Sequence, residues 1–154
     1  MSRFFLCMLV GLALPAYAQD ASQTAPKGQV HTQAQQFVQQ AAIGDMYEIQ
    51  SSQMAESKSK NPEIRSFAQH IIKDHTAASE KLTSLAQKIQ GLQVPQQMDT
   101  RHLDLINRLR SASASQFDDL YRGQQVQAHR QAIQLYQTFA SGGDSPEQIS
   151  TARN

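Results

Sequence analysis

The chain has 154 residues, of which 40% are hydrophobic and 18% charged, with a formal net charge of +1 and one cysteine, Cys7. A chain of this length forms one domain with a modest core. Because the charge is close to neutral and the basic residues do not cluster, we expect neither nucleic acid nor an anionic membrane surface as a partner.

Residues 1–18 have the pattern of a signal peptide. The basic Arg3 is followed by an apolar run from Phe4 to Leu14 and by small residues at Ala16 and Ala18, which predicts cleavage before Gln19. The apolar run is too short to cross a membrane as a helix, and no later stretch is long enough. We therefore expect a periplasmic or secreted protein that has no transmembrane segment in the mature chain. Cleavage would also remove the only cysteine, which excludes disulfides and cysteine metal sites.

The mature chain is expected to begin with a flexible leader. Residues 19–31 are rich in Ser, Thr, Ala, Gln and Gly and have no hydrophobic period. Residues 32–154 then form the domain, whose first helix is predicted from about Thr32 to Ser59. At roughly 100° per residue, five small or apolar side chains of this segment fall on one helix face. They are Phe37, Ala41, Gly44, Met54 and Ala55.

Glu48 falls in the middle of this apolar face. An unpaired buried charge is costly, so a carboxylate at this position needs a reason. The small neighbours Ala41 and Gly44 leave room around it. Two interpretations stay open: a carboxylate directed into the bundle, or one at the edge of the apolar face that reaches water or pairs with a lysine.

The second helix is predicted from Asn61 to Gly91 and has signals at both ends. Asn61 can cap the first turn, Pro62 suits the first helical position, and Gly91 can end the helix. The apolar residues recur at steps of four and three, and His75 occupies a position where this series demands a buried residue. The apolar members are Ile64, Ala68, Ile71, Ala78, Leu82, Leu85 and Ile89.

Two further helices follow a loop that contains Pro95. A short amphipathic helix is predicted from about Asp99 to Arg110, with His102 at its surface, and a long helix from about Gln116 to Ser141. Ser115 and Asp118 have the spacing of a capping box for the long helix. The long helix has two adjacent apolar stripes, and His129 completes the second. The stripes are Phe117, Tyr121, Ala128, Leu135 and Phe139, and Val126, Ile133, Tyr136 and Ala140.

These segments predict an all-α fold, an antiparallel bundle of three long helices with short helices between them. A last helix that begins near Ser145 would be truncated, because the sequence ends at Asn154. A truncated last helix would leave one face of the long helix open, and an open apolar face predicts a protein partner or a homodimer. The residues of that face are Val126, Ile133, Tyr136 and Ala140.

Glu48, His75 and His129 are the candidate metal ligands. Carboxylates and imidazoles that project inward from different helices are how bundles bind iron, manganese or zinc. The Glu-x-x-His pair of di-iron proteins is missing, so these three residues predict at most a site for one ion. Asp74 and Tyr121 could support the histidines from beside the site.

A buried polar network without an ion is the alternative for the same residues. In that case, the histidines would bond to Glu48 or Tyr121 within the core. The sequence has no nucleophile arrangement and no phosphate-binding loop, which favours a protein without enzymatic activity. A transition metal is therefore the only cofactor that the sequence suggests.

Three stretches resemble a bacterial secreted domain of unknown function with a ferritin-like four-helix bundle. They are FVQQAAIGDMYEIQSSQMA, NPEIRSFAQHIIKDHTAASEKL and FDDLYRGQQVQAHRQAIQLYQTFAS, and the resemblance covers Phe37 to about Glu147. Members are often labelled outer membrane or periplasmic proteins, and the resemblance implies the same inward positions for Glu48, His75 and His129. Members also resemble one another in a full last helix with a further histidine, which this chain lacks.

The resemblance implies a fold and a compartment, but no settled activity. Two functions remain. The first is a non-enzymatic periplasmic bundle that acts in envelope or stress physiology through protein contacts. The second is a ferritin-like protein that binds iron, manganese or zinc at the interior glutamate and histidines.

Overall fold

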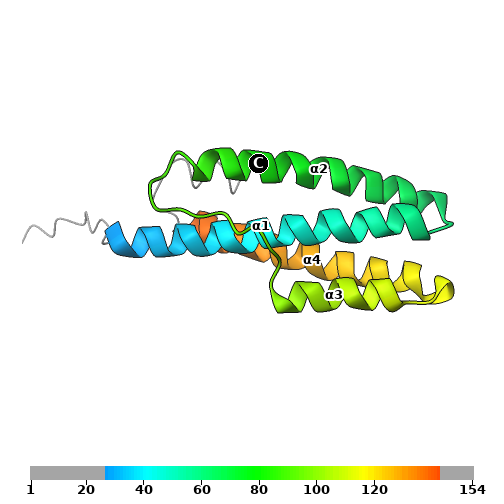
Figure 1. The fold of residues 1–154 in the computed structure, drawn as a ribbon. Helices are drawn as coiled ribbons and strands as arrows, with labels where there is room; N and C mark the ends of the chain where they lie inside the picture. Colours follow the sequence, from blue (N-terminus) through cyan, green and yellow to red (C-terminus); the bar gives the residue numbers. More distant parts are fainter. Residues whose placement is uncertain (1–26, 143–154) are drawn as a thin grey trace, which may run out of the picture.

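The computed structural model describes residues 27–142, and this part of the chain is folded into four α-helices without a β-strand (Figure 1). The predicted all-α class is therefore confirmed. The helices are α1 (Lys27–Lys58), α2 (Pro62–Ala86), α3 (Thr100–Ser111) and α4 (Ala114–Gly142).

Helix α1 is the central element of the fold. It packs most extensively against α2, and also contacts α4 and α3. Figure 1 shows α2 along one side of α1, with α3 and α4 on the other. The short α3 accompanies only one end of α4, so the two ends of α4 have different surroundings.

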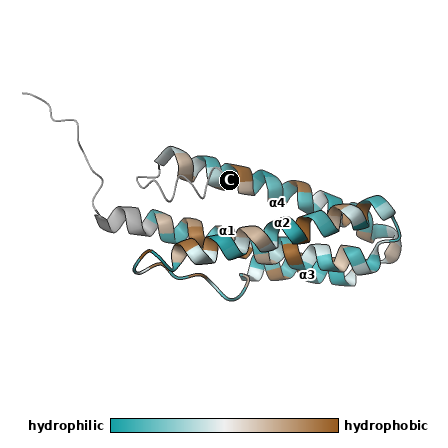
Figure 2. Cartoon of the chain, turned by 90° about the horizontal axis from the view of Figure 1, so that it is seen from above, coloured by the Kyte–Doolittle hydropathy of each residue, from teal (hydrophilic) through white to brown (hydrophobic). Residues whose placement is uncertain are grey.

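The core consists of two apolar clusters at opposite ends of the bundle. In the first, the rings of Phe37 in α1 and Phe139 in α4 stack with their centroids 4.1 Å apart. In the second, Phe117 and Tyr121 of α4 pack with Ala55 of α1. Figure 2 shows hydrophobic segments that alternate with hydrophilic ones along each helix, as amphipathic helices require. Between the two clusters, the buried face of α1 is polar.

Helix α2 begins where the sequence predicts but ends earlier. The side chain of Asn61 accepts a hydrogen bond from the backbone N–H of Glu63 at 2.9 Å, and Pro62 is the first helical residue. The predicted end at Gly91 is wrong, because α2 stops at Ala86. Gly91 instead adopts φ +91° in the turn that follows, which is a backbone conformation that glycine favours.

The starts of α1 and α4 also differ from the predictions. Helix α1 begins at Lys27, so residues 27–31, expected in the flexible leader, are helical. Helix α4 begins at Ala114, which places Ser115 inside the helix and makes the predicted capping box wrong. Helix α3 agrees closely with its prediction, since Asp99 caps it by accepting a hydrogen bond from the N–H of His102 at 2.8 Å.

The expectation of a short last helix is not met in the described chain. Its last helix, α4, is 29 residues long and continues to Gly142, one residue beyond the end predicted for the long helix. The predicted helix near Ser145 lies outside the described residues, as do the predicted signal peptide and the start of the leader.

The packing of α3 can be tested with two leucines of the same helix. Leu109 is fully buried, whereas Leu103 is exposed. We expect Leu109→Ala to lower the free energy of unfolding by about 2–5 kcal/mol, because it leaves a cavity in the core. Leu103→Ala should change it by less than about 1 kcal/mol. Urea unfolding followed by circular dichroism measures both, and equal losses would show that α3 does not dock as described.

Candidate metal centre

The polar face of α1 lies midway along the helix. Asp45, Glu48, Ser51 and Ser52 are all buried there, on successive turns of the same side. A buried polar group is costly unless it has a hydrogen-bond partner. The partners for this face come from α2 and α4, so the polar groups form a layer across the bundle between the two apolar clusters.

The structure brings Glu48, His75 and His129 together from three different helices. Glu48 in α1 is only 3% exposed. Its Oε1 lies 3.5 Å from Nδ1 of His129 in α4, and the two histidine rings lie 6.0 Å apart at nearly a right angle. One ligand atom from each residue lies within 4.8 Å of the other two. The two histidines are less buried than Glu48, because 21% of the His75 side chain and 43% of the His129 side chain are exposed.

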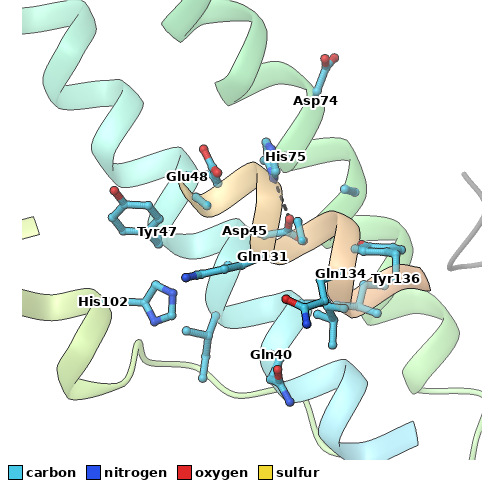
Figure 3. Close-up of a pocket in the computed structure, with 18 of the residues that line it drawn as sticks. Gln40, Asp45, Tyr47, Glu48, Asp74, His75, His102, Gln131, Gln134 and Tyr136 are labelled. Carbon is cyan, nitrogen blue, oxygen red and sulfur yellow. Dashed lines mark hydrogen bonds and ion pairs between the residues drawn. The ribbon is translucent and has the colours of Figure 1, made fainter. Parts of the chain in front are cut away.

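Asp45 is a site residue that the sequence analysis missed. Its Oδ1 lies 2.8 Å from Nδ1 of His75, and its carboxylate is buried. The sequence suggested such a supporting role for Asp74, but Asp74 is exposed and points away from the other labelled residues in Figure 3. The available signal was the spacing, since Asp45 precedes Glu48 by three residues and shares its helix face.

Tyr121 and Gln125 of α4 complete the polar layer. The hydroxyl of Tyr121 lies 2.8 Å from Oγ of Ser52, so Tyr121 bonds to a serine and not to a histidine as suggested. Gln125, which the sequence analysis did not single out, donates from Nε2 to Oγ of Ser51 at 3.0 Å. Its backbone carbonyl accepts a hydrogen bond from Nδ1 of His129 at 3.0 Å.

Two carboxylate oxygens in this layer have no hydrogen-bond partner among the described residues. They are Oε2 of Glu48 and Oδ2 of Asp45, and both are buried. An ionised carboxylate can only accept hydrogen bonds or bind cations. The donor set therefore has unused capacity for a positive group, and a metal ion fits it chemically.

The surroundings of the polar layer raise the pKa values of Glu48 and His75. Burial raises the pKa of Glu48 above its ordinary value, and the nearby charges of His129 and His75 oppose this only in part. Burial alone would lower the pKa of His75, but the hydrogen bond with Asp45 and the negative charges of Glu48 and Asp45 raise it overall. Without an ion, both groups therefore hold protons more tightly than they would in water.

The site opens into a cavity of about 1080 Å³ between α1, α2, α4 and the start of α3 (Figure 3). Its wall includes Glu48 and His75 at one end and His102 at another. His102, expected at the surface, is half-buried, bonds to Asp99 at 2.7 Å and packs against the ring of Tyr47. It is not part of the group formed by Glu48 and the other two histidines.

Comparison with known proteins identifies a family but no activity. Residues 19–154 match the family model described as "Domain of unknown function (DUF4142)". Neither a curated protein nor a solved structure matches the chain. In the described residues, no helix is long and apolar enough to span a membrane.

The pKa shifts predict how the stability of the metal-free protein depends on pH. Because the folded pKa values of Glu48 and His75 are raised, their stabilising contributions are complete below the unfolded values of about 4.5 and 6.5. These contributions are lost as the pH rises through the folded values. We therefore expect the free energy of unfolding to fall between about pH 5 and 8.

Urea unfolding of metal-free wild type and Glu48→Gln across that range measures this dependence. The variant should have a flatter profile, because its amide does not titrate. Glu80→Gln, which makes the same change at an exposed carboxylate on the same helix as His75, serves as the control. Parallel profiles for wild type and Glu48→Gln would contradict the conclusion that titration of Glu48 contributes to the pH dependence of stability.

Proposed function

The chain belongs to the DUF4142 family, and we propose that it is an exported metal-binding protein with a ferritin-like helical bundle. It holds one divalent transition-metal ion through Glu48, His75 and His129. The main support is the convergence of three ligand atoms within 4.8 Å of one another, around a buried carboxylate with an unpartnered oxygen.

The donor types favour a transition metal. Two imidazoles with one carboxylate suit iron, manganese or zinc, whereas calcium and magnesium prefer oxygen ligands alone. Binding requires ligand atoms at about 2.0–2.2 Å from the ion, which rotation of the three side chains could achieve. Three protein ligands leave coordination positions for water or another small ligand from the cavity.

The hydrogen bonds of the histidines also support this proposal. A histidine that ligates a metal through one nitrogen usually donates a hydrogen bond from the other. Nδ1 of His75 is bonded to the carboxylate of Asp45, and Nδ1 of His129 to the carbonyl of Gln125. Because these hydrogen bonds occupy Nδ1 of each ring, we propose that the ion binds through Nε2. A polar network without an ion accounts for these bonds, but not for the unpartnered oxygen of Glu48.

The export and the absence of catalysis rest on the sequence. Residues 1–18 have the order of a secretory signal, which supports a periplasmic or secreted location. We propose metal binding without a catalysed reaction, because the sequence offers no nucleophile and base arrangement beside the site. Holding or buffering an ion in the bacterial envelope is the role that fits these features.

Metal analysis of the mature chain tests this proposal. Residues 19–154, purified without a chelating tag and equilibrated with zinc, iron(II) or manganese(II), should retain about one ion per chain. His75→Ala and His129→Ala should reduce retention to background, because each removes one of three ligands. His70→Ala is the matched control, since His70 is an exposed histidine of α2. If the wild type retains no metal, the metal-site proposal fails, and a polar network without an ion remains as the interpretation of these residues.

Protein contact through α4 is a second candidate function. Val126 and Ile133 lie two turns apart on one face of α4 and are 52% and 57% exposed. The open face is narrower than the sequence suggested, because Tyr136 packs edge-on against Phe37 at 5.1 Å and Ala140 is half-buried. We propose that Val126 and Ile133 form a contact surface for a partner or a second copy.

Sedimentation velocity tests the second-copy form of this contact. We expect the wild type to self-associate with increasing concentration, and Val126→Ser with Ile133→Ser to remain monomeric. Both substitutions are at exposed positions, so the melting temperature should change little. Identical sedimentation of the two proteins as monomers would rule out a homodimer through this surface.

A further inference from the structure

We infer that Asp45 is a positioning residue of the metal site, which holds His75 in the tautomer that presents Nε2 to the ion. This inference rests on the proposed function and extends it. Asp45 bonds to His75 but lies outside the group of Glu48, His75 and His129 whose ligand atoms converge. Its role is therefore to orient a ligand.

The hydrogen bond between Asp45 and His75 fixes the position of the ring proton. Oδ1 of Asp45 lies 2.8 Å from Nδ1 of His75. An ionised carboxylate has no hydrogen to donate, so the hydrogen in this bond is carried by Nδ1. A neutral imidazole that is protonated at Nδ1 has its free electron pair at Nε2, which is then the only nitrogen that can bind a metal.

The helix that carries Asp45 also carries a metal ligand. Asp45 and Glu48 are three residues apart on α1, so their side chains leave the same helix face. The rigid backbone of α1 thereby sets the distance between the orienting carboxylate and the ligating one. His75 from α2 contacts Asp45 at Nδ1, while its ring faces that of His129 at 6.0 Å.

The surroundings of Asp45 direct its charge toward His75. The side chain is 7% exposed, and His75 is its only ion-pair partner among the described residues. A buried carboxylate without a lysine or arginine partner needs another positive group nearby. A metal-bound histidine supplies one, because the ion withdraws electrons from the ring and strengthens the hydrogen bond that Nδ1 donates.

Zinc affinity of three variants tests this role in the chain from residue 19 to 154. We expect Asp45→Ala to bind zinc about 10- to 100-fold more weakly than wild type, which is the usual effect of losing an orienting partner. Asp45→Asn keeps the size of the side chain and one acceptor oxygen, so its loss should be smaller. Asp74→Asn should bind as wild type, because Asp74 is exposed and is not bonded to His75.

Nitrogen-15 NMR of the imidazoles separates positioning from a merely structural role. In zinc-loaded wild type, His75 should show a protonated Nδ1 and a metal-bound Nε2. In Asp45→Ala, this pattern should be lost or mixed with the opposite one. A residue that only stabilised the fold would lower the melting temperature and leave the tautomer of His75 unchanged in the folded protein.

The outcomes distinguish this inference from the proposed function. Zinc binding by wild type, with equal affinity and an unchanged His75 pattern in both Asp45 variants, would overturn the role of Asp45 alone. Failure of the wild type to bind zinc, iron(II) or manganese(II) would overturn the metal site, and the role of Asp45 with it. Weaker binding in the Asp45 variants, with Asp74→Asn unaffected, would support both.

Discussion

The burial of the Glu48 carboxylate is the constraint on which the middle of this bundle depends. A carboxylate that is nearly inaccessible to water must be compensated by hydrogen bonds, positive charge or a proton. The fold supplies His129 at 3.5 Å and His75 nearby, and still leaves one oxygen of Glu48 without a partner among residues 27–142. The site therefore favours a positive group, and protons would compete with the proposed metal ion for the same place.

Burial of the two apolar clusters stabilises the fold and offsets the free-energy cost of burying the Glu48 carboxylate. The stacked rings of Phe37 and Phe139 secure one end of the α1 and α4 pair, and Phe117 and Tyr121 secure the other. The polar layer between them is thus held from both sides, so its side chains need not drive association of the helices. Such an arrangement is typical of helix bundles that place a binding site in their interior.

Within the polar layer, each helix has a different task. In the proposed metal site, helix α1 provides the ligand Glu48 and the orienting Asp45, whereas α2 and α4 each provide one histidine. Nδ1 of His129 donates a hydrogen bond to the backbone carbonyl of Gln125, as Nδ1 of His75 does to Asp45. Removing one member therefore affects its neighbours, and the effects of substitutions within this layer should not add.

Local patterns of the sequence determined the helices and the buried face on which Glu48 lies, because helical period and caps depend on residues close in the chain. The end of α2 at Ala86 and the bond between Asp45 and His75 were decided by tertiary packing. That packing depends on the rotation and offset of one helix against another, which no local pattern encodes. For the same reason, Asp74 adjoins His75 in sequence yet faces solvent, while Asp45 reaches it from another helix.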